Sequence, residues 1–180
     1  MFARTARLML RPGWREDAPA LHAAIADEAV VTKLARAPWP YALADAEAFL
    51  ARPVEPCLPS LLLFERGEGA PRLVGGAGLH RETDGSVALG YWIAQDRWGR
   101  GYATEAGRAV VEMARALGHK RLMAGHFIDN AASGRVLAKL GFCPTGRIAA
   151  CGSAARGRPS PTIVSTLVLA DEEEARPLAA

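Results

Sequence analysis

A glycine-rich segment at residues 96–107, DRWGRGYATEAG, has the composition of an anion-binding turn. Gly99 and Gly101 leave the main chain with little side-chain cover just before a stretch of helical periodicity. Free N–H groups at the start of a helix, reinforced by the helix dipole, form a binding site for phosphate-like groups. Arg97 and Arg100 add positive charge beside the turn. We therefore expect its successive N–H groups to form a concave site that suits a pyrophosphate.

Two other nucleotide-binding motifs do not fit this turn. A dinucleotide fingerprint needs a third glycine at the position that Thr104 occupies. A Walker A loop counted from Gly99 needs Gly-Lys where this chain has Thr104 and Glu105. A tight turn whose glycines serve packing alone remains the alternative interpretation.

The hydrophobic pattern around the turn predicts an α/β fold. Apolar runs predict strands at residues 5–11, 58–66, 72–81, 86–93, 121–127, 145–150 and 161–170. Helical periodicity predicts helices at residues 16–27, 43–52, 103–117 and 130–140. The order β-α-α-β-β-β-α-β-α-β-β indicates a mixed sheet. Asp84-Gly85 is a hairpin signal, so the three consecutive strands over residues 58–93 are expected to be antiparallel.

Composition indicates one domain without nucleic-acid or membrane features. The chain has 180 residues, half of them apolar, and a formal net charge of +3, which is too small to favour nucleic acid. We expect a single domain over residues 1–170 and an acidic, flexible tail at 171–180. The N-terminus lacks the apolar run of a signal peptide, and charges interrupt the later apolar stretches. We therefore expect a cytoplasmic protein.

The cysteines and histidines do not have the spacing of a metal site. Their positions are Cys57, Cys143, Cys151, His22, His80, His119 and His126. An odd number of cysteines without paired spacing predicts reduced thiols. We therefore expect no metal cofactor.

Two motifs together resemble the GNAT superfamily of N-acetyltransferases, in the form of its RimJ/RimL-type branch of ribosomal-protein acetyltransferases. WGRGYATEA at residues 98–106 resembles the acyl-CoA-binding signature Gln/Arg-x-x-Gly-x-Gly/Ala. Gly101 and Ala103 match its last two fixed places, and Trp98 stands where Gln or Arg would be. DNAASGRVLAKLGF at residues 129–142 is similar to the Asn-x-x-Ser-x-x-x-Leu-x-Lys-Leu-Gly-Phe helix of that branch. The resemblance implies a mixed, mostly antiparallel sheet with helices on both faces.

The resemblance also implies where acetyl-CoA, as co-substrate, would bind. The pantetheine arm would bond the backbone of a strand that splays away from its neighbour, and the glycine turn would hold the pyrophosphate. Asn130 and Ser133 would meet the pantetheine arm or the thioester. The alternatives are an N-cap for Asn130 and a small first-turn residue for Ser133. The expected cofactor-binding residues are Tyr91, Trp92, Ile93, Gly99, Arg100, Gly101, Tyr102, Ala103, Thr104, Asn130 and Ser133.

Three places at which relatives carry acid or base groups hold other residues here, namely Ala88, Gly125 and Leu137. Ser133 is therefore the expected catalytic residue, acting as a hydrogen-bonding relay, while His80 and His126 are further candidates whose alternative is a structural role. The implied activity is acetyl transfer to a primary amine by direct attack, without a covalent enzyme intermediate.

Two classes of acceptor fit the sequence, a protein N-terminal amine and a small-molecule primary amine. Trp39 and Tyr41 lie where the family has its acceptor cleft, with packing against the second helix as the alternative. Many members of this branch are dimers, which leaves a homodimer open. Because the usual acid–base residues are absent, a non-catalytic acyl-CoA-binding or sensing module is the rival interpretation.

Overall fold

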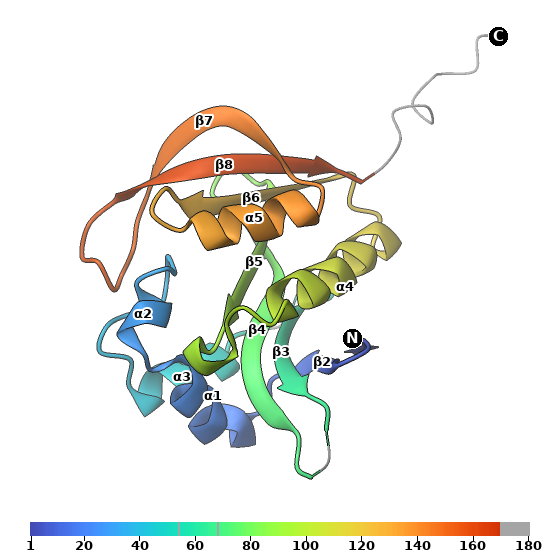
Figure 1. Cartoon of the computed structure of the whole chain (residues 1–180), viewed down its shortest axis with the longest axis vertical. Helices are drawn as coiled ribbons and strands as arrows, with labels where there is room; N and C mark the ends of the chain where they lie inside the picture. Colours follow the sequence, from blue (N-terminus) through green and yellow to red (C-terminus); the bar gives the residue numbers. More distant parts are fainter. Residues whose placement is uncertain (54, 68, 170–180) are drawn as a thin grey trace, which may run out of the picture.

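The computed structural model describes residues 1–53, 55–67 and 69–169 (Figure 1). Its eight strands form one sheet in the order β1-β2-β3-β4-β5-β6-β8-β7. They are β1 (Ala3–Arg4), β2 (Leu8–Pro12), β3 (Ser60–Glu65), β4 (Arg72–Arg81), β5 (Val87–Ile93), β6 (Arg121–Phe127), β7 (Cys143–Cys151) and β8 (Ser160–Val168). The strands pair antiparallel except β5 and β6, which are parallel. The predicted mixed α/β fold is confirmed, and the tail predicted at 171–180 lies outside the described residues.

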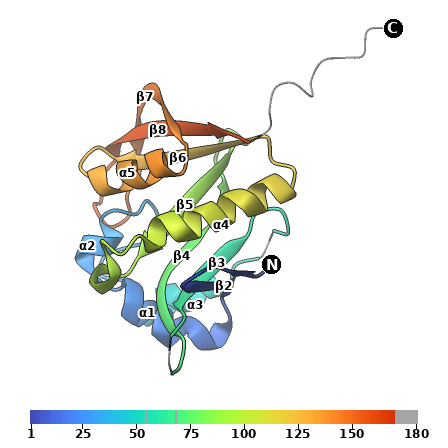
Figure 2. The ribbon, with the colours of Figure 1, turned by 45° about the vertical axis from the view of Figure 1, so that its right-hand side comes forward.

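Helices cover both faces of this sheet (Figures 1 and 2). They are α1 (Ala18–Ile25), α2 (Glu28–Val31), α3 (Leu43–Leu50), α4 (Tyr102–Ala116) and α5 (Ala131–Lys139), with 3-10 turns η1 (Arg15–Asp17) and η2 (Gln95–Arg97). The apolar stripe of α4, including Val110 and Ala114, packs with Leu89 and Leu122 into one core. A second core forms where α1 and α3 pack together, with Leu21 among its members.

The sequence predictions differ from the structure mainly near the N-terminus. The strand predicted at residues 5–11 is a short hairpin of β1 and β2, because the Thr5 hydroxyl accepts from the Leu8 N–H at 3.0 Å and turns the chain. The helix predicted at 16–27 is interrupted, and α2 is an additional helix. Asp27 causes this, since its carboxylate accepts from the Ala29 N–H at 2.8 Å and caps a new helix. Most other elements agree to within about two residues.

The parallel strands β5 and β6 separate almost as soon as they meet. A single bridge, Ala88 opposite Met123, joins them. Beyond it β5 continues to pair with β4 through Ile93, and β6 continues to pair with β8 through Phe127. The sheet therefore opens into two arms, as Figure 1 shows between β5 and β6.

The loop between β7 and β8 packs against the chain that follows α2, on the other side of the opening. The segment between β7 and β8 is hydrogen-bonded to the chain that follows α2. The Ala154 N–H donates to the Ala35 carbonyl at 2.9 Å, and the Ser153 hydroxyl donates to the Leu34 carbonyl at 3.0 Å. Arg156 donates to the Thr32 carbonyl at 2.6 Å. Its guanidinium also stacks on Phe127 of β6.

A buried ion pair fixes the start of α1 to the sheet. Arg11 of β2 donates two hydrogen bonds of 2.7 Å to Asp17, and both side chains are about one-tenth exposed. The Arg11 guanidinium lies between the rings of Trp14 and Phe64. Burial alone would raise the pKa of Asp17, but the hydrogen bonds from Arg11 and from the Trp14 N–H outweigh it and lower that pKa.

We predict that Asp17→Asn lowers the free energy of unfolding by about 3 kcal/mol, because it leaves a buried guanidinium without its counter-charge. Urea denaturation at neutral pH measures this. Glu112→Gln, which breaks the exposed pair with Arg115 on α4, is the control and should change stability by less than about 1 kcal/mol.

The same pair predicts a pH dependence. Because the pKa of Asp17 is lowered on folding, its contribution is present above the unfolded value of about 3.9 and is lost as the pH falls through the folded value. The stability difference between wild type and Asp17→Asn should therefore shrink below about pH 4. An undiminished difference at pH 3 would contradict this assignment.

Candidate functional site

The opening between β5 and β6 exposes the backbone of one strand. The Ala94 N–H donates to the Val74 carbonyl at 2.9 Å, which makes this a hydrogen-bonded pair of the β4–β5 ladder. Hydrogen-bonded and non-hydrogen-bonded pairs alternate in an antiparallel ladder, so the N–H groups of Tyr91 and Ile93 point away from β4 and into the opening. Trp92, the third residue expected here, directs its backbone toward β4 instead.

Trp98, which stands where the signature has Gln or Arg, contacts the end of β5. Its indole N–H donates to the Ile93 carbonyl at 2.8 Å. That carbonyl faces the opening, where no strand can satisfy it. A tryptophan thus satisfies a main-chain acceptor at the edge of the site, a role that no local sequence signal indicates.

The glycine turn follows β5 and presents bare backbone at the same opening. Gly99 and Gly101 have φ of 75° and 79°, a left-handed backbone that glycine adopts without strain. This conformation lets α4 begin directly at Tyr102. The N–H groups of residues 99–104 have no hydrogen-bond acceptor within the described part of the chain. The arrangement provides the concave row of donors that an anion requires.

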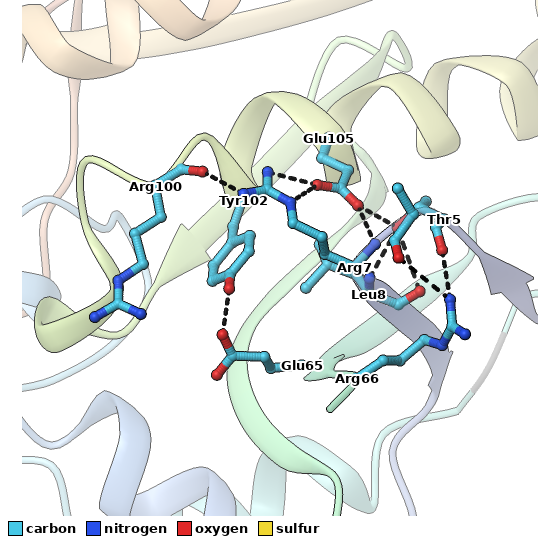
Figure 3. A network of polar contacts seen from close by, with 9 residues as sticks. Thr5, Arg7, Leu8, Glu65, Arg66, Arg100, Tyr102 and Glu105 are labelled. Carbon is cyan, nitrogen blue, oxygen red and sulfur yellow. Dashed lines mark hydrogen bonds and ion pairs between the residues drawn. The ribbon is translucent and has the colours of Figure 1, made fainter. Parts of the chain in front are cut away.

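A network of polar contacts holds the turn in this shape (Figure 3). Arg7 donates to the Arg100 carbonyl at 2.9 Å and forms an ion pair of 2.6 Å with Glu105. Glu105 also accepts from the Thr5 hydroxyl at 2.6 Å. Burial would raise the pKa of Glu105, but the bonds from Thr5 and Arg7 outweigh it and lower the pKa. The carbonyl of the turn therefore faces Arg7, which leaves the N–H side of the turn free.

A second carboxylate, that of Glu65, holds the residues on either side of the turn. The Tyr102 hydroxyl donates to Glu65 of β3, and Arg97 contacts the other oxygen of Glu65 at 3.1 Å. The bond from Tyr102 is the main cause of the lowered pKa of Glu65. Arg97 is thus a structural cation rather than a free one. Arg100, the other arginine expected near the anion, directs its guanidinium away from this network in Figure 3.

Tyr91 and Ser133 connect β5 to the opposite arm. Their hydroxyl oxygens lie 2.7 Å apart, and either one can be the donor. Tyr91 also donates to the Ser133 carbonyl at 3.1 Å. Burial raises the pKa of Tyr91 to about 12, an effect that the Ser133 hydrogen bond only partly offsets, so its phenol is protonated at neutral pH. Sequence reasoning assigned only the Tyr91 backbone and missed this hydroxyl.

Asn130 takes the capping role that was one of its two interpretations. Its side chain accepts from the Ser133 N–H at 3.3 Å, at the first turn of α5. Leu137 of α5 is buried in the core.

The two candidate histidines have different surroundings. His126 packs under Gly134 of α5, and burial lowers its pKa. His80 of β4 lies opposite Ala88, and its Nε2 is 3.0 Å from Glu82. Burial and Arg36 lower the pKa of His80, while Glu82 partly opposes them.

The two aromatic residues expected in the acceptor cleft have different surroundings. Tyr41 is buried in the core formed with α1 and α3, and burial raises its pKa to about 12. It nevertheless contributes to the wall of the cleft. Trp39 is 41% exposed and does not line that cleft.

One continuous cleft of about 1580 Å³ connects these features. It is lined by the glycine turn, by Tyr91 and Ser133 at the opening, and by His80 on the far side of the sheet. A donor molecule and an acceptor can therefore reach the opening from opposite faces.

The described residues contain no group of three or more His, Cys, Asp or Glu side chains that could hold a metal ion. The three cysteines are free thiols. No helix in the described part of the chain has both the length and the apolar character to span a membrane.

Comparisons with known proteins agree with the motifs. Residues 7–143 match the family described as acetyltransferase (GNAT) domain. No curated protein sequence matches the chain.

Solved structures share the fold at low sequence identity. An acetyltransferase of the GNAT family from Bacillus anthracis is 20% identical, with a TM-score of 0.79 over 94% of this chain and 99% of that one. Ribosomal-protein-S5-alanine acetyltransferase from Vibrio fischeri is 18% identical, with a TM-score of 0.77 over 95% and 98%. Spermidine N-acetyltransferase from Vibrio cholerae, in complex with CoA and spermine, is 16% identical, with a TM-score of 0.73 over 92% and 97%.

We predict that Ala103→Glu removes the stabilisation of this protein by acetyl-CoA. Ala103 is in the first turn of α4, where a carboxylate is favourable to the helix but repels a bound phosphate. Wild type should melt at a higher temperature when acetyl-CoA is added. The variant should bind at least about tenfold more weakly.

Ala103→Gln is the matched control, with nearly the same size and no charge. It should keep more of the melting shift than the Glu variant, and the unliganded Glu variant should melt no lower than the Gln variant. Equal shifts in the two variants would mean that the anion binds elsewhere.

Proposed function

Since the chain belongs to the acetyltransferase (GNAT) family, we propose that it transfers the acetyl group of acetyl-CoA directly to a primary amine. The observation that carries this proposal is the opening between β5 and β6, where unpaired N–H groups of Tyr91 and Ile93 continue into the donors of the glycine turn. These donors suit an extended molecule with amides at one end and a pyrophosphate at the other. The donors of β5 and those of the glycine turn line the same cleft.

The backbone donors have a role in the reaction as well as in binding. When the lone pair of a neutral amine attacks the thioester carbon, negative charge develops on the carbonyl oxygen. Fixed N–H groups in a site shielded from water stabilise such an oxyanion. The free N–H groups of β5 are placed for this task without any rearrangement of the strand.

Tyr91 and Ser133 supply the proton that the departing thiolate requires. The C–N bond forms first, and collapse of the oxyanion then restores the C=O bond and breaks the C–S bond. The sulfur gains a proton from Tyr91 through Ser133, the amine nitrogen releases one to water, and Tyr91 regains its proton from water. Tyr91 is protonated at neutral pH, and Ser133 shares its hydrogen bond at 2.7 Å. In this proposal Ser133 is the relay and Tyr91 is the proton source behind it.

We propose an acceptor that is either a protein N-terminal amine or a small-molecule amine, because proteins of this fold are named as an alpha-N-protein acetyltransferase and as a spermidine N-acetyltransferase. We also propose that the protein works in the cytoplasm, without nucleic acid or membrane. Its net charge of +3 and its three free thiols support that location. Light scattering decides whether it is a homodimer.

The direct test is thiol release from acetyl-CoA with a panel of primary amines, together with mass detection of the acetylated amine. We expect thiol release that depends on the amine, and little of it with the Ala103→Glu variant. Binding of acetyl-CoA without turnover on any amine would instead favour the acyl-CoA-binding module.

Tyr91→Phe should lower kcat by roughly 10²-fold, the smaller end of the range for an acid–base group. KM for acetyl-CoA and the melting shift should change little, because the backbone donors remain. Ser133→Ala should also lower kcat, and the double variant should be no worse than the poorer single one, since the two hydroxyls act as a unit.

The wild-type rate should show no alkaline decline from Tyr91 below its pKa of about 12. A Tyr91→Phe variant with unchanged kcat would exclude this residue as the proton source.

A further inference from the structure

A small pocket opens from the cleft on the face of the sheet opposite α4. It measures about 550 Å³ and lies between β4, the end of β7, the β7–β8 loop and the chain after α2. His80, Glu82 and Arg36 line both this pocket and the large cleft, so the two are continuous. Arg158 completes the pocket from the loop.

The inner end of the pocket is close to the point where the sheet opens. His80 is opposite Ala88, and Ala88 makes the single bridge between β5 and β6. The His80 ring lies beside Gly90, where an added Cβ would be in ordinary van der Waals contact with the ring at 3.4 Å. The imidazole therefore packs on β5 beside the opening.

Two arginines of the pocket have no partner among the residues that the structure describes. Arg36 and Arg158 are exposed, and neither side chain makes an ion pair or a hydrogen bond with the described residues. Arg156 provides the contrast within the same loop, because it is held by Thr32, Asp129 and Phe127. The loop thus uses one arginine to fix its position and leaves another directed at the pocket.

The charges of the pocket do not cancel. Arg36 and Arg158 carry two positive charges and Glu82 is the only carboxylate that lines the pocket, which leaves a net charge of +1 there. An acceptor with several positive charges would meet repulsion at this position. An anionic group would be attracted there, and arginine binds carboxylate and phosphate with paired hydrogen bonds.

We propose that this pocket selects acceptors that carry a carboxylate or phosphate in addition to the reacting amine. Arg36 and Arg158 hold the anionic group, and the amine is directed past His80 toward the opening. This inference rests on the proposed acetyl transfer and adds the substrate class. Polyamines are poor acceptors on this basis.

The test compares three acceptors of the same length, namely 5-aminopentanoate, 5-aminopentanamide and 1,5-diaminopentane. Their distal groups are anionic, neutral and cationic, while the reacting amine is the same. We expect kcat/KM to be at least about tenfold higher for the anionic acceptor than for the neutral one, mainly through KM, and lowest for the diamine. Comparing kcat/KM for phosphoethanolamine with that for ethanolamine shows whether the pocket also recognises a phosphate.

Arg36→Gln and Arg158→Gln should each remove most of the preference for the anionic acceptor. Arg108→Gln, an exposed arginine of α4 outside the pocket, is the control and should keep the preference. Melting curves establish that all three variants are folded.

Binding of the same acceptors to the CoA-loaded protein, measured by calorimetry, gives a readout that does not require turnover. Absence of turnover with every amine would contradict the proposed function, while tighter binding of aminopentanoate would still support the pocket. Equal binding of the anionic and cationic acceptors, or a preference unchanged in both arginine variants, would overturn the inference.

Discussion

The separation of β5 from β6 is the constraint on which the rest of the structure depends. A sheet normally satisfies the backbone of every interior strand, and unpaired polar groups in the interior are costly. Here β5 is interior in strand order but has one bridge on its β6 side. β6 pairs with β8 through its other edge, so its edge toward β5 is also unpaired beyond the single bridge. The open edge of β5 is therefore a permanent row of donors and acceptors inside the domain.

The neighbouring polar contacts complete this arrangement by fixing which backbone groups remain free. The Trp98 indole donates a hydrogen bond to the Ile93 carbonyl, and the Arg7 guanidinium donates one to the Arg100 carbonyl. These two acceptors are thus satisfied by side chains, while the N–H donors beside them have no partner among the described residues. This bias toward donors favours an electron-rich ligand without requiring many cationic side chains. It also accounts for the structural use of Arg97, whose charge is neutralised by Glu65 and Asp96.

Local sequence signals predicted the parts of the fold that have strong local causes. The stripe of α4, the glycines before it and the Asn130 cap depend on residues close together in the chain, and all three are found. The N-terminal hairpin was missed because the alternation of residues 5–11 resembles one strand, whereas the Thr5 hydroxyl favours a turn. The Tyr91–Ser133 contact and the pocket with Arg36 and Arg158 join residues at least 40 positions apart. No periodicity or motif encodes such a juxtaposition, since it arises only when the two arms of the sheet are assembled.

The docking of the β7–β8 loop has a mechanical consequence for the site. The arm with β6, β7 and β8 and the arm with β2 to β5 meet at the Ala88–Met123 bridge, which acts as a hinge point. Arg156 forms a second tie, because it stacks on Phe127 of one arm and donates to Thr32 of the other. Two separate points of contact resist a change in the angle between the arms, whereas a single point of contact would allow the arms to rotate about it. Arg156, together with the bonds of Ser153 and Ala154 to the chain after α2, therefore restrains the angle between the arms, and with it the width available to a thioester, from a loop outside the glycine-turn and α5 motifs.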